Sequence, residues 1–225
     1  MNYAVIVAAG KSKRMGENVD KAFVTLGSKP VLAYSLRAFE RCPDIDGIIV
    51  VVRKERLEAA CGLAKMFGGA KVRKVVAGGA QRQTSVMNGL AELNEDVTIV
   101  AVHDGGRPCV TPALISATIL SAKRHGSGVA AVKVTDTIKQ VDAGLTVTKT
   151  VDRSKLWAVQ TPQTFKVDVL RKALEAADRG GLTITDEASA VEAAGGKVHL
   201  VESSVTNMKI TTPDDLMMVA AVLKV

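Results

Sequence analysis

The chain has 225 residues, 47% of them hydrophobic and 24% charged, which is ordinary for a globular protein in water and enough for one large domain or two small ones. Aromatic residues make up only 3%, which argues against the repeated stacking platforms of a single-strand nucleic-acid binder. Lysine and arginine total 30 against 23 acidic residues; the net charge of +7 serves general solubility or indicates an anionic partner, namely a nucleic acid, an anionic lipid or a phosphorylated small molecule.

The cysteines and the first residues bear on location. Cys42, Cys61 and Cys109 show neither CxxC nor mixed Cys/His spacing, which argues for a reducing compartment and against a disulfide framework or a zinc site. The N-terminal stretch lacks the charged region of a signal peptide, and no uncharged apolar run approaches about 18 residues. We therefore expect a cytoplasmic protein without a membrane span.

Short runs rich in β-branched residues recur along the chain, separated by stretches with helical spacing. The runs are AVIVAA (4–9), GIIVVV (47–52), KVRKVVA (71–77), VTIVAV (97–102) and GVAAVKV (128–134). Two of the apolar helical faces are formed by Val31, Leu32, Ser35, Leu36 and Phe39, and by Val86, Met87, Leu90 and Leu93. This pattern predicts the α/β class, with a mostly parallel central sheet and helices on both faces. Ligands of such sheets bind beyond the carboxyl ends of the strands.

The first run leads into a basic loop, in VIVAAGKSKRMG (5–16). Neither a Walker phosphate loop nor a dinucleotide fingerprint fits, because Val5, Ser12 and Met15 stand where those motifs need glycine. Beside Gly10 and Gly16 the loop carries four cations, Lys11, Lys13, Arg14 and Lys21. Positioned cations stabilise the charge of a reacting triphosphate, so the loop favours a nucleotide site; a solvated basic turn is the alternative.

Two later loops carry groups that suit a nucleotide. In GGAQRQTSV (78–86), Gly78 and Gly79 precede a helix expected to begin near Arg82, where backbone amides can bind an anion or read a base edge, or simply cap the helix. In HDGGRP (103–108), Asp104 and Arg107 suit a metal-bound phosphate or a ribose hydroxyl, or form a local salt bridge.

Two further residues need separate interpretations. Without a nucleophile motif beside it, His103 is interpreted as a packed or capping histidine. Lys209, in NMKITTPDD (207–215), is expected at a strand end before a strongly capped helix. A lysine on the surface is ordinary, but this one is expected at the end of a strand, as are the basic loop and the two loops that suit a nucleotide.

The segment 135–157 breaks the alternation of strands and helices. Two alternating runs surround DAG, which predicts a β-hairpin with its turn near Asp142 to Gly144. A lone hairpin is marginally stable in water, so we expect it to pack on something, such as a second subunit, unless it is a plain surface hairpin. We see no interdomain linker, and predict one domain over 1–225 with this arm.

The remaining residues predict helices and strands in turn. Helices are expected over 166–179 and 185–195, strands over 197–204 and 205–211, and a closing helix over 212–225. The closing helix is expected to have Thr212 as its N-cap and Pro213 at its first position, followed by two aspartates that favour the helix dipole.

Taken together, these segments resemble a known family. VAAGKSKRMG, DKAFVTLGSKPVL, GGAQRQTSV, HDGGRP, DTIK, TVDRSKLWAVQTPQTF, TDEASAVEAAG and NMKITTPDDL are similar, in order and spacing, to the 2-C-methyl-D-erythritol 4-phosphate cytidylyltransferases. The resemblance runs essentially from end to end. It implies a Rossmann-like nucleotidyltransferase fold, a homodimer with interlocking arms, and transfer of CMP from CTP with Mg²⁺ to a sugar-alcohol phosphate, releasing pyrophosphate.

The resemblance also implies roles for individual residues. The catalytic cations at the triphosphate would be Arg14, Lys21 and Lys209. The CTP-binding residues would be Ala8, Ala9, Gly10, Ser12, Gly79, Arg82, Ser85, Asp104 and Gly105. The substrate-binding residues would be Arg107, Thr137, Arg153 and Thr185, with the pair on the arm reaching a neighbouring subunit. Asp104 is also the candidate metal ligand, with Mg²⁺ held mainly by CTP; Thr185 could equally be a plain N-cap.

Some positions depart from the pattern of the family. Many members have proline where Val7 and Asp20 stand, and alanine at Gly105 and Gly106. Asp20 is the departure of most concern, because a carboxylate beside Lys21 would repel a triphosphate unless it is turned away.

Three alternative functions remain at this point. A ribitol 5-phosphate cytidylyltransferase would share the fold, the CTP site and much of the arm. A non-catalytic nucleic-acid binder would spread its cations along one face, whereas here a group of them follows strand ends, and aromatics are scarce. An NAD-dependent oxidoreductase is disfavoured by the missing glycine fingerprint.

Overall fold

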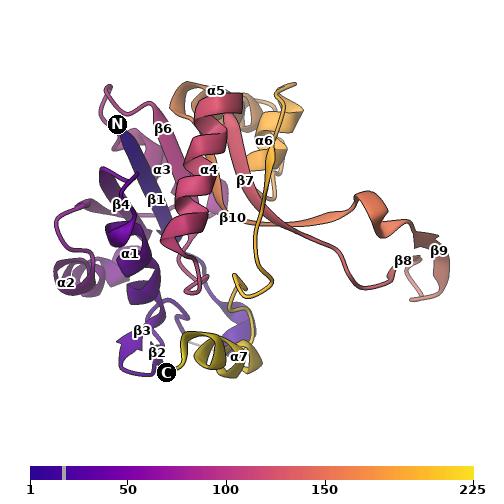
Figure 1. The fold of residues 1–225 in the computed structure, drawn as a ribbon, viewed down its shortest axis with the longest axis horizontal. Helices are drawn as coiled ribbons and strands as arrows, with labels where there is room; N and C mark the ends of the chain where they lie inside the picture. Colours follow the sequence, from indigo (N-terminus) through magenta and orange to yellow (C-terminus); the bar gives the residue numbers. More distant parts are fainter. Residues whose placement is uncertain (17–18) are drawn as a thin grey trace.

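The computed structural model describes residues 1–16 and 19–225, and within these ranges the fold is a seven-stranded sheet with helices on both faces (Figure 1). The strand order is β11-β7-β10-β6-β1-β4-β5. The strands are β1 (Asn2–Ala8), β4 (Gly47–Val52), β5 (Val72–Ala77), β6 (Ile99–Asp104), β7 (Ser127–Lys133), β10 (Trp157–Lys166) and β11 (Leu200–Glu202). Only β10 runs antiparallel to its described neighbours, β6 and β7, so the predicted mostly parallel sheet is confirmed.

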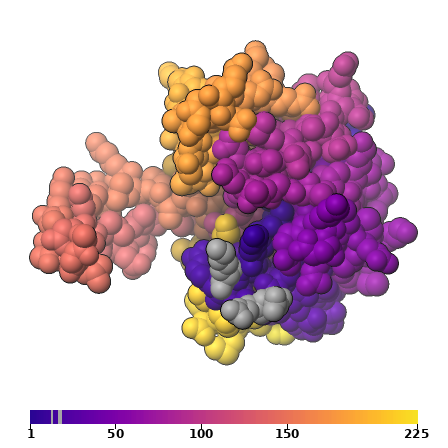
Figure 2. Space-filling model, turned by 180° about the vertical axis from the view of Figure 1, so that it is seen from behind, coloured from indigo at the N-terminus to yellow at the C-terminus, as the bar shows by residue number. Residues whose placement is uncertain are grey.

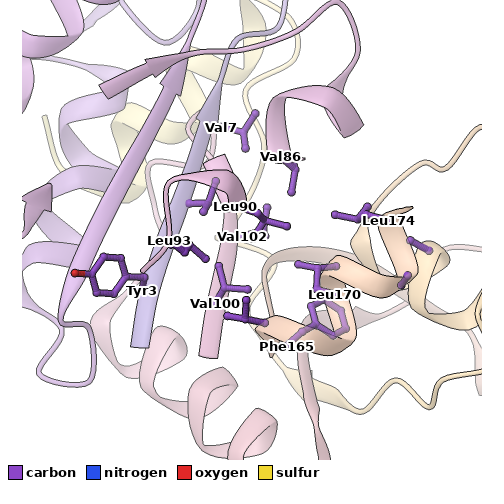
Figure 3. Close-up of a cluster of buried hydrophobic side chains, with 14 of the residues drawn as sticks. Tyr3, Val7, Val86, Leu90, Leu93, Val100, Val102, Phe165, Leu170 and Leu174 are labelled. Atoms are coloured by element: carbon purple, nitrogen blue, oxygen red, sulfur yellow. The ribbon is translucent and has the colours of Figure 1, made fainter. Parts of the chain in front are cut away.

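Helices cover the two faces of the sheet in separate groups. They are α1 (Val31–Arg41), α2 (Leu57–Phe67), α3 (Arg82–Ala91), α4 (Pro112–His125), α5 (Val167–Arg179), α6 (Glu187–Ala193) and α7 (Asp214–Leu223). On one face, α3, α5 and α6 pack on the cluster drawn in Figure 3, to which Leu90 of α3, Leu170 of α5 and Val7 of β1 belong. On the other face, α1, α2 and α4 pack on a second cluster, to which Ala4 and Ile6 of β1 belong. Because successive side chains of a strand point to opposite faces of the sheet, one buried run of apolar residues contributes to both cores.

Strand β10 was not expected from the sequence, because its middle is polar. Gln160, Thr161, Gln163 and Thr164 are all buried in it. Their partners come from distant segments: Asn207 donates to Gln160 Oε1 at 2.9 Å, and the amide of Gln163 donates to Asp186 Oδ2 at 2.8 Å. Buried polar groups are tolerated when they are hydrogen-bonded, so tertiary contacts stabilise a strand that hydrophobic patterning misses.

The predicted hairpin is present and projects from the rest of the molecule, as Figure 1 and, from the opposite side, Figure 2 show. Strands β8 (Ile138–Val141) and β9 (Val147–Val151) pair with each other in a sheet of their own. The turn is where the sequence placed it, with Asp142 Oδ1 accepting hydrogen bonds from the backbone N–H groups of Gly144 and Thr146, both at 2.9 Å. The short 3₁₀ helix η3 (Arg153–Lys155) follows β9 at the base of this arm.

The C-terminal segment differs from the expectation in two places. The segment 205–211 was expected to be a strand, but it forms a turn and irregular backbone. Helix α7 begins at Asp214, so Thr212 is not its N-cap; instead Asp215 Oδ2 accepts from the backbone N–H of Thr211 at 2.7 Å and of Thr212 at 2.8 Å. The helix packs with Val31, the first residue of α1, and with Leu26, in the short hairpin of β2 (Thr25–Leu26) and β3 (Lys29–Pro30), to form a third cluster.

Within residues 1–16 and 19–225, no helix combines the length and the apolar character needed to cross a bilayer.

Candidate active site

A cavity of about 400 Å³ opens at the carboxyl ends of β1, β4, β5 and β6. This is the edge at which parallel α/β sheets bind ligands. Its walls come from the loops after those strands and from Lys209 near the C-terminus. The lining residues that the sequence had assigned to the site are Ala8, Ala9, Gly10, Lys21, Gly79, Arg82, Ser85, Asp104 and Lys209. Residues from four loops and a C-terminal segment are thus brought to one place.

Asp104 holds the centre of the charged groups in this cavity. Its Oδ2 atom lies 2.7 Å from Lys209 Nζ and 3.9 Å from Arg107 Nε. Its Oδ1 atom accepts from Arg82 Nε at 3.2 Å and from Arg82 Nη2 at 3.1 Å. Burial by itself would raise the pKa of Asp104, but the charges of Arg82 and Lys209 outweigh it and hold that pKa well below the usual range. Asp104 is therefore an anion at every pH of biological interest.

Arg82 bridges two carboxylates instead of pointing freely into the cavity. Besides Asp104 it binds Glu187, the first residue of α6, with Nη2 at 2.9 Å from Oε2 and a second contact from Nη1. Glu187 is fully buried, and burial raises its pKa despite the neighbouring guanidinium. The guanidinium fork suits such bidentate pairing. Arg82 thus connects the start of α3 with the end of β6 and with α6.

Lys21 reaches the cavity from the loop after β1. Its Nζ atom donates to the carbonyl oxygen of Ile210 at 2.7 Å. Burial and the nearby charge of Lys209 lower the pKa of Lys21 to about 8, against the opposing influence of Asp104. Gly106 lies beside it, where a Cβ atom would be 3.0 Å from Lys21 Cε. The absence of a side chain at Gly106 leaves space for the lysine.

His103 is fully buried next to the cavity and takes no part in it. Its Nε2 atom is 3.2 Å from the carbonyl oxygen of Arg107, which can only accept, so Nε2 carries the proton. Its Nδ1 atom is 3.0 Å from the hydroxyl of Thr161. Burial lowers the pKa of His103 to about 3, so the ring is neutral with both nitrogens engaged. This confirms the interpretation of His103 as a packed residue.

Several predicted residues lie near the cavity without lining it. The Ser12 hydroxyl accepts from the backbone N–H of Lys21 at 3.3 Å, and Gly105 donates its N–H to Val7 O at 2.9 Å. Arg107 donates to Asn207 O at 2.8 Å. Arg14 is exposed in the 3₁₀ helix η1 (Lys13–Met15), and its charge contributes to the lowered pKa of Lys21. The side chain of Lys13 lies outside the described residues.

Three predicted substrate contacts lie away from the cavity walls. Thr137 and Arg153 are exposed at the base of the arm, 3.5 Å apart between Oγ1 and Nη1. Thr185 is exposed before α6. It is not the N-cap of that helix, because Asp186 forms a capping box with Ser189.

The sequence analysis overlooked one wall of the cavity. Arg53, Lys54 and Glu55 line it directly after β4. The signal was present, since RKER (53–56) follows the apolar run GIIVVV just as the basic loop follows the first run. The same wall explains Asp20, whose carboxylate is turned toward Arg53 at 2.8 Å and Arg56 at 3.5 Å. Both guanidiniums offset the charge that had raised concern.

The residues present fit a magnesium ion that arrives with a nucleotide. In the part of the chain that the structure describes, no three His, Cys, Asp or Glu side chains are grouped to hold a metal ion. Asp104 is the one predicted metal ligand, and it lines the cavity. Mg²⁺ is commonly bound through one or two carboxylates together with substrate phosphates and water, so a single carboxylate is an adequate protein contribution.

The chain was compared with known proteins. The family model described as 2-C-methyl-D-erythritol 4-phosphate cytidylyltransferase matches residues 2–225. A curated protein of that name from Alkaliphilus metalliredigens is 44% identical over 97% of this chain and 91% of its own length. The protein of that name from Desulforamulus reducens is 45% identical over 98% and 95%.

Solved structures agree with these sequence matches. The crystal structure of the cytidylyltransferase of this name from Thermus thermophilus aligns with a TM-score of 0.80 at 32% identity, over 98% of each chain. That of 4-diphosphocytidyl-2C-methyl-D-erythritol synthase from Anaerococcus prevotii aligns with a TM-score of 0.88 at 29% identity, over 100% of this chain and 96% of the other. The resemblance read from the sequence is confirmed, and the ribitol alternative is not favoured. The chain belongs to the 2-C-methyl-D-erythritol 4-phosphate cytidylyltransferase family.

Proposed function

We propose that the cavity at the strand ends carries out the reaction of the family. The chain is a CTP-dependent cytidylyltransferase that transfers CMP from CTP to 2-C-methyl-D-erythritol 4-phosphate, giving 4-diphosphocytidyl-2-C-methyl-D-erythritol and pyrophosphate. The observation that supports this location is the convergence of Lys21, Lys209 and Asp104 from distant parts of the chain on one cavity. In this proposal the two lysines, together with Arg14, whose charge acts on Lys21, hold the triphosphate.

The nucleotide would lie along the loops after β1 and β5. The backbone at Ala8, Ala9 and Gly10 would cradle it, with Ser12 keeping the loop closed on Lys21. The N–H of Gly79 donates to the Ser85 hydroxyl at 3.1 Å, and that hydroxyl donates to Gln81 O at 3.0 Å. Gly79 and Ser85 would thus hold in place the loop that selects the base. Asp104 and Gly105 would meet the ribose. Arg82, which is occupied by two carboxylates, would act by fixing Asp104.

The reaction needs no covalent nucleophile and no general base. A phosphate oxygen of the acceptor, already anionic at neutral pH, attacks the α-phosphorus of CTP, and the bond from that phosphorus to the bridging oxygen of the β-phosphate breaks, with pyrophosphate leaving. The main obstacle is the approach of two anions, so positioned lysine and arginine charges lower the barrier. The neutral, fully hydrogen-bonded His103 is consistent with a site that moves no proton.

Magnesium and the second subunit complete the proposal. Asp104 would contribute the protein ligand of Mg²⁺, which when bound neutralises phosphate charge, and Lys209 would move from Asp104 to the phosphates. Arg107 and Thr185 would contact the acceptor. Thr137 and Arg153, exposed on the arm, would reach the acceptor in the site of a second copy of this chain.

We also propose that residues 1–225 form a single nucleotidyltransferase domain, with the arm as its dimerisation element. The first and last sheet strands in the chain, β1 and β11, belong to the same sheet. In the absence of a membrane-spanning helix in the described ranges, we expect it to act in the cytoplasm on small-molecule substrates, without nucleic acid.

The acceptor assay tests the proposed function. Pyrophosphate release from CTP with Mg²⁺ should be fast with 2-C-methyl-D-erythritol 4-phosphate and at least about 10²-fold slower in kcat/KM with ribitol 5-phosphate, since acceptor contacts are worth a few kcal/mol together. Equal or faster release with ribitol 5-phosphate would instead assign the chain to that substrate. Release without any acceptor is the background to subtract.

A further inference from the structure

Asp20 is buried at the wall of the cavity and faces away from the lysine that follows it. The residue is 5% exposed. Its Oδ2 atom accepts from Arg53 Nη2 at 2.8 Å and lies 3.5 Å from Arg56 Nε. A carboxylate this deeply buried is costly unless paired, so its partner at Arg53 determines where it lies.

Asp20 also closes the turn that carries Lys21. Its Oδ1 atom accepts from the backbone N–H of Ala22 at 3.3 Å, and its carbonyl oxygen accepts from the N–H of Phe23 at 2.9 Å. An aspartate that bonds the backbone two residues on makes an Asx turn, with the intervening residue at its centre. That residue is Lys21, whose own N–H donates to the hydroxyl of Ser12.

Arg53 ties this turn to the sheet. It is the first residue after β4, which is fully buried and pairs with β1 along its whole length. Its second partner, Glu55, is an exposed carboxylate at 3.0 Å, the kind of surface contact that contributes little. The link from Asp20 to Arg53 therefore joins the loop that carries Lys21 to the end of a fully buried strand.

We propose that Asp20 is a positioning residue that, through its ion pair with Arg53, holds the Lys21 turn so that the lysine stays in the cavity. The proposal rests on the role given to Lys21 above. Lys21 threads past Gly106 to reach Ile210 O at 2.7 Å, an arrangement that a shifted turn would lose. Displacement of a catalytic group by about 1 Å can cost about 10²-fold in rate.

The first experiment compares Asp20→Asn with the unaltered chain in steady-state pyrophosphate release. The amide keeps an oxygen for the Asx turn but loses the charge that binds Arg53, so kcat should fall about 10-fold while the KM of the acceptor stays nearly constant. In a Lys21→Ala background the same change should have no further effect, because Asp20 acts through that lysine. Glu92→Gln, which removes an ion pair with Lys74 away from the cavity, is the matched control and should leave turnover unchanged.

Two results would overturn the proposal: unchanged kcat in Asp20→Asn, or an equal loss in the presence and absence of Lys21. If Asp20→Asn does not fold, Arg53→Gln in the same two backgrounds gives the same decision, since it leaves the bonds of the turn in place.

A second readout separates this proposal from the assigned reaction. In protein with ¹³C-dimethylated lysines, the NMR signal of Lys21, identified by its loss in Lys21→Arg, should shift in Asp20→Asn and stay fixed in Glu92→Gln. This measurement needs neither CTP nor acceptor. A signal that does not move in Asp20→Asn contradicts the positioning role even if the enzyme turns over as expected.

Discussion

Lys21 carries its charge in surroundings that disfavour charge, and this affects the pH range in which the site can work. Burial and Lys209 together lower its pKa to about 8. Asp104 opposes that shift but is shared with Lys209 and Arg82. A site that gathers cations for a triphosphate therefore loses part of its charge in mild alkali while it is empty.

The first prediction follows from that pKa. A lysine is charged below its pKa and neutral above it, so kcat/KM for CTP should be level up to about pH 7 and decline as the pH rises through about 8. A guanidinium stays charged over this range, so Lys21→Arg should move the decline to higher pH, whatever its maximal rate. Profiles of kcat/KM against pH for both proteins provide the check. A decline at the same pH in both would show that another group is responsible.

At the scale of elements, close contacts between helices and the sheet set the shape of the cavity edge. Helix α3 begins at Arg82, in the wall of the cavity, and its Gly89 packs against β1 and β4. A Cβ atom at Gly89 would lie 2.5 Å from Val5 Cγ1 and 3.0 Å from Val51 Cγ2. The lack of a side chain lets the helix lie close enough for Arg82 to reach Asp104.

The second prediction compares two helical glycines. Gly89→Ala should lower the free energy of unfolding by about 1–3 kcal/mol, because the new methyl group overpacks a buried contact. Gly62→Ala, at an exposed position of α2 with nothing within 4 Å of the new Cβ, should raise it by about 0.5–1 kcal/mol. Urea unfolding followed by circular dichroism measures both. Equal effects of the two changes would mean that helix propensity, and not packing, decides at Gly89.

At the scale of the whole molecule, the arm stands apart, because it adds no strand to the central sheet of the described chain. Its strands β8 and β9 pair only with each other among the described strands, and Leu145 at its tip is 82% exposed. A two-stranded ribbon of this kind is marginally stable by itself. Its base carries Thr137 and Arg153, which is consistent with the proposed dimer in which each arm completes the site of the other subunit.

The third prediction uses subunit mixing. Lys209→Ala should lower kcat by about 10²-fold, as expected for loss of one positioned charge, whereas Arg153→Ala should mainly raise the KM of the acceptor, so activity is measured at an acceptor concentration at which both variants are nearly inactive. In a mixed dimer one site would take its core from the first variant and its arm from the second, and would be intact. Random exchange should therefore restore about a quarter of the unaltered activity. If mass spectrometry shows exchange and activity stays at the level of the single variants, the site is not shared.

Local patterns in the sequence were sufficient for most of the architecture. Apolar runs such as GIIVVV and the helical spacing of Leu32, Leu36 and Phe39 reflect burial on two faces of a sheet, a property encoded in adjacent residues. The hairpin turn at Asp142 is local as well. Lys21 of the basic loop, Asp104 and Lys209 were predicted as site residues because they follow apolar runs or resemble family motifs, and all three line one cavity.

The tertiary structure decided what depends on partners far along the chain. The polar strand β10 is stable because Asn207 and Asp186 satisfy its glutamines. The carboxylate of Asp20 is paired with Arg53, 33 positions later in the chain, and its charge is therefore offset where an anion would bind. Composition and periodicity describe a residue and its near neighbours, whereas the free energy of a buried polar group depends on which distant atom meets it in the folded chain. The sequence by itself therefore determined the α/β class, the arm and the family, while the folded chain determined which charges are paired and which side of the cavity each one faces.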